Sequence, residues 1–162
     1  VLCRRSALDQ AIEPRNLCLN LQSWADHQAR QSTPFTPAVN GLLALAQALK
    51  ELDEQGGWKS RRMRYRTLAS RVADTCKKLG VTEWLPAQES SCVLRSYHLP
   101  AGMTYNQLHD GLKQQGFVIY AGQGDLATHL FRISTMGEIS DYDMARLEQA
   151  LILVIEGARN QK

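Results

Sequence analysis

The sequence lacks the cysteine pattern that a disulfide framework or a zinc site would need. Its four cysteines are scattered along the chain, with no Cys-x-x-Cys pair and no histidine clustered with them at ligand spacing. We therefore expect reduced thiols in a cytoplasmic protein, and no bound metal. The positions concerned are Cys3, Cys18, Cys76 and Cys92.

Long apolar runs and a strong net charge are also missing. The longest apolar run, Ala150–Ile155, is far too short to cross a bilayer, and no signal peptide opens the chain. The formal charge of +3 over 162 residues does not point to a nucleic acid or a membrane, and we expect neither as a partner. The chain starts at Val1 without a methionine, in what resembles the middle of a strand, so we expect a fragment.

The composition, with 44% hydrophobic and 22% charged residues, is that of an ordinary globular protein. Residues 1–35 show only short apolar pieces. A long helix is expected to follow, with Thr36 as its cap, Pro37 in its first turn and the Gly56-Gly57 pair at its end. A second helix is expected over 58–79, with Trp58 and Cys76 on its buried face and Gly80 after its end.

From residue 81 onward the pattern predicts strand, helix, strand, strand, helix. The strands are expected at 92–97, 117–120 and 130–134, the first helix after a capping box at Thr104–Gln107, and the last from Ser140. Two helices that cover one face of a small sheet satisfy this order. The fold class is therefore α/β.

Arg132 is the first candidate site residue. Strand alternation places Phe131 and Ile133 on one face and Arg132 on the other, where its guanidinium can meet a planar carboxylate. The pattern alone favours a simpler interpretation, a surface arginine paired with Asp125 or Glu138.

Three other segments have a possible role in phosphate binding. Thr33 and Thr36 precede the long helix, where amides and a hydroxyl can bind phosphate, although ordinary capping is the favoured interpretation. The run 122–127 imitates a dinucleotide fingerprint, but a strand follows it where a helix is required. The basic run 59–66 with Arg71 could contact phosphates, and a solvated helix face is favoured.

A catalytic centre is not evident in this sequence. A Schiff-base lysine needs a desolvated, electropositive pocket, and each of the six lysines lies on a polar helix face, near a helix end or at the terminus. The histidines share no metal-like spacing, and no Ser/His/Asp or Cys/His arrangement stands out.

Two C-terminal motifs resemble a known family. The run 112–124 (LKQQGFVIYAGQG) and the run 130–139 (LFRISTMGEI) resemble the C-terminal signature of 2-aminoethylphosphonate–pyruvate transaminases, which are class V aminotransferases of pyridoxal phosphate (PLP) fold type I. The helix segment 44–52 matches in kind and position, and the opening residues resemble the strand after the lysine loop. The segment 32–37 and the run Ile133–Gly137 depart from the usual forms, which leaves the substrate open.

The resemblance implies a homodimer that binds PLP. It implies that Arg132 grips the carboxylate of the keto acid, and that Thr36, with Thr33 as the fallback, reaches the partner's PLP phosphate. It further implies a remnant of the large domain at 1–35, a connecting helix at 36–57 and the small α/β domain at 58–162. The Schiff-base lysine would lie outside this chain, so we expect the fragment alone to be inactive.

The expected reaction of the intact enzyme converts 2-aminoethylphosphonate and pyruvate to phosphonoacetaldehyde and alanine. An alanine– or serine–glyoxylate transaminase is the alternative within the class. Outside the class, a freestanding α/β ligand-binding module and a nucleic-acid-binding domain that uses the basic helix remain open.

Overall fold

The computed structural model describes residues 2–9 and 16–160, which divide into a first unit, residues 1–51, and a second unit, residues 52–162. Each unit is considered by itself. None of the helices in the described ranges is long and apolar enough to cross a membrane.

The first unit consists of α1 (Arg5–Leu8), α2 (Leu21–Ala29) and most of α3 (Val39–Glu54). None of its described residues is buried. Helix α2 is absent from the sequence prediction, although Asn20 caps it by accepting a hydrogen bond from the Ser23 amide at 3.1 Å. Trp24 contacts Phe35 at 6.0 Å between ring centroids, and its Nε1 donates to the Cys18 carbonyl at 3.2 Å.

The expectation that Thr36 caps the long helix is wrong. Helix α3 begins at Val39, because the Ala38 carbonyl accepts the first helical hydrogen bond, from the Leu42 amide at 3.0 Å. Thr36 precedes Pro37, and the proline ring disfavours a helical conformation in the residue before it. The Val39 amide closes a tight turn on the Pro37 carbonyl at 2.9 Å, so the chain turns once before the helix starts.

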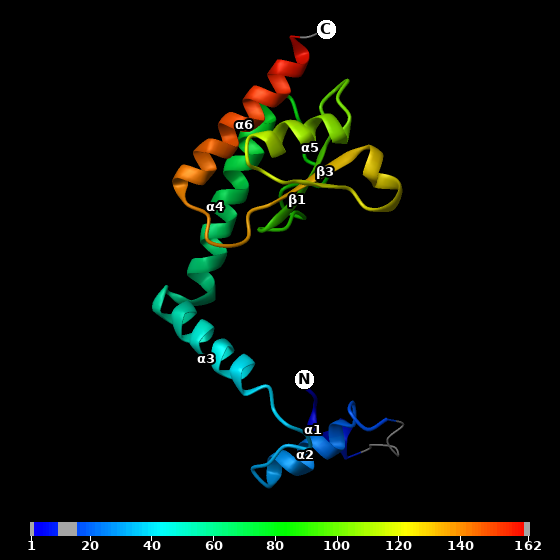
Figure 1. Ribbon diagram of the computed structural model, residues 1–162, viewed down its shortest axis with the longest axis vertical. Coiled ribbons are helices and arrows are strands. Elements are labelled where there is room, and N and C mark those ends of the chain that lie inside the picture. The colour runs from blue at the N-terminus through cyan, green and yellow to red at the C-terminus, as the bar shows by residue number, and fades with distance from the viewer. Residues whose placement is uncertain (1, 10–15, 161–162) are drawn as a thin grey trace. The chain divides into compact units, whose positions relative to one another are not determined.

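The second unit contains a three-stranded antiparallel sheet in the order β1-β3-β2, formed by β1 (Leu94–His98), β2 (Tyr120–Ala121) and β3 (Leu130–Ser134). Its helices are α4 (Gly57–Lys78), α5 (Tyr105–Gln114) and α6 (Asp141–Arg159), and α6 packs against both of the others (Figure 1). A short 3₁₀ helix, η1 (Gly124–Thr128), joins β2 to β3. The predicted order of strands and helices is confirmed.

The predicted strand ends differ from the observed ones for local reasons. The Ser91 hydroxyl accepts hydrogen bonds from the Val93 and Leu94 amides, which holds the chain in a bend and delays β1 to Leu94. After α5, Gly116 adopts a φ of 88°, and the Phe117 amide returns to the Leu112 carbonyl at 2.9 Å. Phe117 therefore belongs to the helix cap, and β2 begins only at Tyr120.

The core lies between the helices and one face of the sheet. Tyr97 and Phe131, a cross-strand pair, stack at 5.4 Å between ring centroids and are at most 1% exposed. Cys76 is fully buried there as expected, and burial raises the pKa of its thiol to about 12, so the thiol is protonated at neutral pH. Trp58, expected on the same face of α4, is 61% exposed, because the core contacts this helix only from Leu68 onward.

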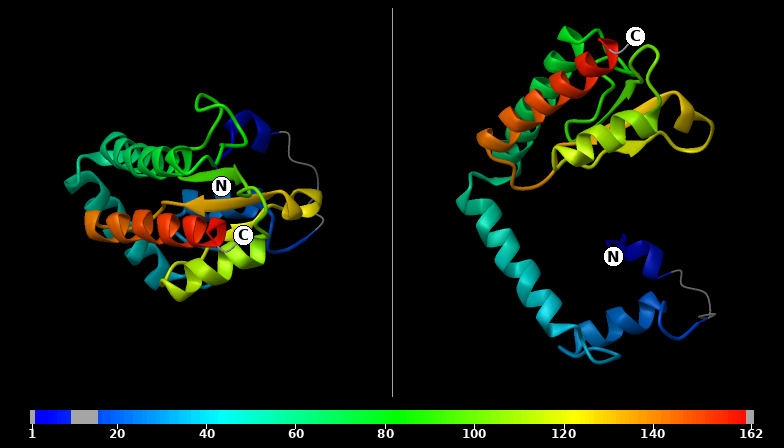
Figure 2. Two further views of the ribbon diagram at one scale, coloured as in Figure 1. Left: turned by 90° about the horizontal axis from the view of Figure 1, so that it is seen from above. Right: turned by 45° about the horizontal axis from the view of Figure 1, so that its top comes forward.

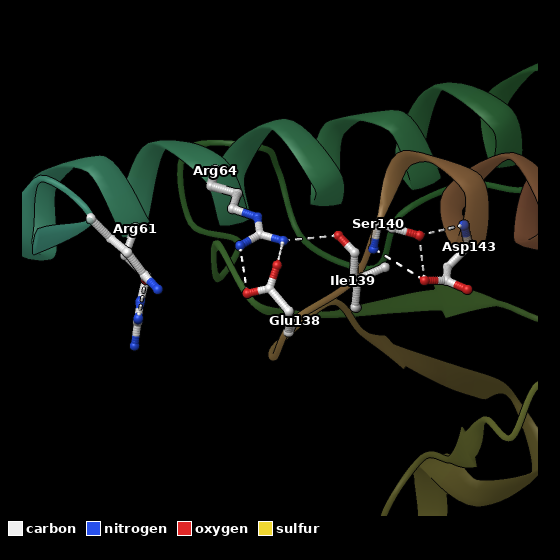
Figure 3. Close-up of polar contacts among 7 residues, drawn as sticks. Arg61, Arg64, Glu138, Ile139, Ser140 and Asp143 are labelled. Carbon is white, nitrogen blue, oxygen red and sulfur yellow. Dashed lines mark hydrogen bonds and ion pairs between the residues drawn. The ribbon is translucent and has the colours of Figure 1, made fainter. Parts of the chain in front are cut away.

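Arginines of α4 hold the segment that enters α6. Arg64 binds Glu138 through both terminal nitrogens, at 2.6 and 2.9 Å, and donates to the Ile139 carbonyl at 3.0 Å (Figure 3). This pairing lowers the pKa of Glu138. Arg71 contacts Asp141 at 2.7 Å and Glu148 at 2.9 Å. The Arg71 bonds join α4 to α6, two helices that run side by side (Figure 2).

Helix α6 starts after Ser140, as expected, and a capping box absent from the sequence prediction holds its first turn. The Asp143 amide donates to the Ser140 hydroxyl at 3.1 Å, and the Ser140 hydroxyl and amide donate to the Asp143 carboxylate (Figure 3). These hydrogen bonds from Ser140 lower the pKa of Asp143.

Because the folded state lowers this pKa, Asp143 stabilises the unit at pH values above the ordinary carboxyl range and loses that effect as the pH falls through its lowered pKa. We predict that Asp143→Asn lowers the free energy of unfolding at neutral pH and that the difference from the parent shrinks in acid. Chemical denaturation across pH measures it. In a Ser140→Ala background the effect should be smaller, and an equal effect at every pH would contradict the prediction.

Two helical glycines should respond oppositely to alanine. A Cβ on Gly111 of α5 would lie 2.7 Å from Val154 Cγ1 of α6, whereas one on Gly157 of α6 would meet nothing within 4 Å. We predict that Gly111→Ala destabilises the chain by about 1–3 kcal/mol through overpacking. Gly157→Ala should be neutral or stabilise it by up to about 1 kcal/mol. Urea denaturation of the two variants provides the measurement, and similar changes in both would contradict the close packing.

Candidate functional site

Arg132 occupies the central strand of the sheet, where two neighbours define its surroundings. Its cross-strand partners are Ser96 of β1 and Tyr120 of β2, so these three side chains share one face. The adjacent residues Phe131 and Ile133 are buried in the core, at 0% and 6% exposure. The alternation predicted for this strand is confirmed, with Arg132 half-buried on the opposite face.

The guanidinium of Arg132 is hydrogen-bonded at Nε, and its two terminal nitrogens are unpaired among the described residues. Its Nε donates to the Ala121 carbonyl oxygen at 2.7 Å. Within the described part of the chain, neither Nη1 nor Nη2 has a hydrogen bond or an ion pair. The simpler interpretation, a surface pair with Asp125 or Glu138, is wrong: among the described residues no ion pair joins Arg132 to either, and Glu138 binds Arg64 instead. The two free nitrogens form the edge that binds a carboxylate in a bidentate arrangement.

Tyr105 is a neighbour of this arginine that the sequence did not reveal. Its hydroxyl donates to the Ile119 carbonyl at 2.9 Å, just before β2. Burial raises the pKa of Tyr105, while a hydrogen bond from the Ala121 amide and the charge of Arg132 act in the opposite direction. In the sequence Tyr105 belongs only to the apolar stripe of its helix, and nothing in that pattern signals a role for the hydroxyl.

The loop after β2 does not form a nucleotide site. Gly122 and Gly124 are followed by the 3₁₀ turn η1 and then by β3, so no α-helix follows the fingerprint-like run. A Cβ on Gly122 would collide with the carbonyl group of Leu126, so the glycine allows the chain to fold closely back on itself.

Thr33 and Thr36 lie in the first unit, and both are exposed. The Thr33 hydroxyl donates to the Phe35 carbonyl at 2.8 Å, which closes a local turn. Among the described residues the Thr36 hydroxyl has no hydrogen bond, so it is available to a ligand. Arg132 belongs to the other unit, and the structure does not relate the two positions to each other.

The basic run of α4 divides into two parts. Arg64 and Arg71 pair with acidic groups near α6, whereas Arg62, Arg66 and Lys77 line an open groove of about 1200 Å³. The groove also contains the ion pair between Arg95 and Glu83, at 3.1 Å.

No lysine within the described ranges has the surroundings of a Schiff-base residue. All of them are exposed and lie on helices: Lys50, Lys59, Lys77, Lys78 and Lys113. Across the same ranges no group of three His, Cys, Asp or Glu side chains could hold a metal ion.

The chain is similar in sequence to curated 2-aminoethylphosphonate–pyruvate transaminases. It is 37% identical over 155 residues to that of Syntrophobacter fumaroxidans, which covers 93% of this chain and 42% of the relative. It is 35% identical over 145 residues to that of Aeromonas hydrophila and 33% identical over 156 residues to that of Vibrio cholerae. The chain thus spans about two fifths of the length of these relatives. No family model matches it.

Solved aminotransferases share the fold. The aspartate aminotransferase of subgroup IV from Thermus thermophilus superposes with a TM-score of 0.72 at 26% identity, over 90% of this chain and 40% of that one. The pyridoxamine–pyruvate aminotransferase of Mesorhizobium loti gives 0.74 at 22% identity, over 98% of this chain and 41% of that one. An alanine–glyoxylate aminotransferase from Nostoc sp. also gives 0.74, at 17% identity, over 88% and 40% of the two chains.

These comparisons confirm the family resemblance inferred from the C-terminal motifs and the predicted fold class. In the sequence comparison and in the structure comparison alike, the match covers most of this chain and a minor part of the other protein, as expected for a C-terminal portion. The chain is therefore similar over most of its length to curated 2-aminoethylphosphonate–pyruvate transaminases, and it has the fold of the solved aminotransferases.

Proposed function

We propose that this chain is the C-terminal part of a PLP-dependent transaminase that transfers the amino group of 2-aminoethylphosphonate to pyruvate. The observation that carries the proposal is the half-buried Arg132, held at Nε and open at both terminal nitrogens, in a chain with these relatives. We place the intact enzyme in the cytoplasm as a homodimer.

In this proposal the chain divides as its sequence suggests. Residues 1–35 are the remnant of the large domain, 36–57 the connecting helix and 58–162 the small domain. The apolar side chains of α3 support a partner surface for this helix, because none of them is buried within the described chain. The exposed set is Val39, Leu42, Leu43, Leu45 and Leu49.

Arg132 binds the carboxylate of the keto acid. Its fixed Nε orients the guanidinium plane, so the Nη edge meets the two carboxylate oxygens without a large loss of side-chain entropy. A single arginine can serve both half-reactions, because the phosphonate of the amino donor is also an oxyanion that accepts paired hydrogen bonds.

The residues present fit one part of a PLP site. PLP supplies the electron sink for amino-group transfer, and the protein supplies binding and orientation. The free hydroxyl of Thr36 would hold the phosphate of the partner subunit's PLP, whereas the Thr33 hydroxyl already donates to the Phe35 carbonyl. The Schiff-base lysine belongs to sequence outside this chain, so the chain alone is inactive.

An alanine–glyoxylate transaminase is the second candidate function. The solved neighbour from Nostoc sp. carries that name and shares the fold. Glyoxylate has the same carboxylate as pyruvate, so Arg132 would serve either keto acid. Turnover of the full-length enzyme with each keto acid and each amino donor separates the two reactions.

We predict that Arg132→Ala in the full-length enzyme raises the KM for pyruvate roughly ten- to a hundredfold, as expected for the loss of a charge-assisted pair. PLP should remain bound, because Arg132 contacts the substrate and not the cofactor. Steady-state kinetics and the PLP absorbance measure the two effects. The control is Arg66→Ala, which removes an exposed arginine of α4. An unchanged KM in Arg132→Ala would remove the anchor assignment.

The two threonines should differ in their effect on the cofactor. We predict that Thr36→Ala weakens PLP binding by the full-length dimer about tenfold, because a hydrogen bond to an ionised phosphate is lost. Thr33→Ala should change the PLP affinity by less than about twofold, because its hydroxyl serves a local turn. Fluorescence titration of the apoenzyme with PLP tests both variants, and the reverse order would assign the contact to Thr33.

A further inference from the structure

The hydroxyl of Tyr105 lies at the free edge of β2, where no further strand extends the described sheet. Tyr105 is the first residue of α5, whose start is held by the capping box between Thr104 and Gln107. From there its side chain reaches the Ile119 carbonyl at 2.9 Å. Its ring packs against the core and contacts His109 at 5.5 Å, so the side chain has a defined direction.

Strand β2 presents its outer edge to this hydroxyl. The Gly122 amide donates to the Leu130 carbonyl at 2.8 Å, so Gly122 and Leu130 form a hydrogen-bonded pair. In an antiparallel ladder such pairs alternate, and the intervening residue directs its N–H and C=O away from the partner strand. That residue is Ala121, and β2 has no strand beyond it in the described sheet.

The outward carbonyl of Ala121 is the group that holds Arg132, because it accepts the Nε hydrogen bond at 2.7 Å. The Tyr105 hydroxyl lies at the same edge, because the carbonyl that accepts its hydrogen bond belongs to Ile119, two residues before Ala121. Three groups from α5, β2 and β3 therefore meet at one edge of the sheet.

The end of β2 is fixed from its other side as well. A Cβ on Gly122 would lie 2.7 Å from the carbonyl carbon of Leu126, so η1 packs directly on the residue after Ala121. The two-residue strand is thus contacted by η1 at its end and by Tyr105 at its free edge. A strand this short has few ladder bonds of its own, so these two contacts determine where the Ala121 carbonyl lies.

We propose that Tyr105 is a positioning residue for Arg132: its hydroxyl holds the free edge of β2, so that the Ala121 carbonyl keeps Nε in place and the Nη edge faces the substrate carboxylate. Tyr105 does not contact the substrate and acts only through β2. This inference rests on the proposed function, because it assigns to Arg132 the role of carboxylate anchor.

The first test follows the Arg132 side chain directly. In the 162-residue chain, NMR measures the rate at which the Arg132 Nε hydrogen exchanges with solvent. Tyr105→Phe removes one oxygen and leaves the ring packed. It should speed this exchange roughly two- to tenfold, in line with the contribution of one hydrogen bond. The matched control is Tyr142→Phe, which removes the hydroxyl of a tyrosine that is 72% exposed on α6. Equal exchange rates in the two variants overturn the proposal.

The second test uses the full-length enzyme. Tyr105→Phe should raise the KM for pyruvate roughly two- to tenfold and leave kcat within about twofold, because a misplaced anchor weakens binding of substrate and transition state alike. If Arg132→Ala raises the KM and Tyr105→Phe does not, the positioning role is overturned while the anchor stands. If Arg132→Ala has no effect either, the proposed function fails, and the exchange rate alone decides whether Tyr105 positions the arginine.

Discussion

Two backbone ladders hold β3 between β1 and β2, and the arrangement of the second unit depends on that pairing. Because β3 is bonded on both sides, its backbone is fixed at the centre of the sheet, and successive side chains point to opposite faces. Phe131 and Ile133 enter the core with Tyr97, and Arg132 is carried to the other side. The same strand thus anchors the hydrophobic core and presents the one cation to which we assign substrate binding.

Arg132 is fixed in position by a carbonyl group, and its positive charge has no acidic partner in the described chain. This combination allows it to bind an anionic substrate. A carboxylate partner would have oriented Arg132 and also satisfied its charge, whereas the Ala121 carbonyl occupies only Nε. The acidic group expected nearby, Glu138, is bound to Arg64 of α4 instead. Because Glu138 pairs with Arg64, the charge of Arg132 stays available to a substrate with a carboxylate or a phosphonate.

The two units differ in how much structure they support by themselves. The second unit has a continuous core that joins its three long helices to the sheet. The first unit has no buried residue in its described part, and the apolar side chains of α3 are exposed. This contrast fits the extent of the matches, since the chain spans about two fifths of its curated relatives. This contrast supports the proposed division into a domain remnant, a connecting helix and a small domain.

The sequence by itself determined what depends on local pattern. Alternation over 130–134 predicted β3 and the face of Arg132. The capping box at Thr104 predicted the start of α5, and Ser140 the start of α6, because these signals act within a few residues. Tertiary structure decided which acid pairs with which arginine, and it brought Tyr105, Ala121 and Arg132 to one sheet edge. Those contacts join residues from different elements, and no spacing along the chain encodes them.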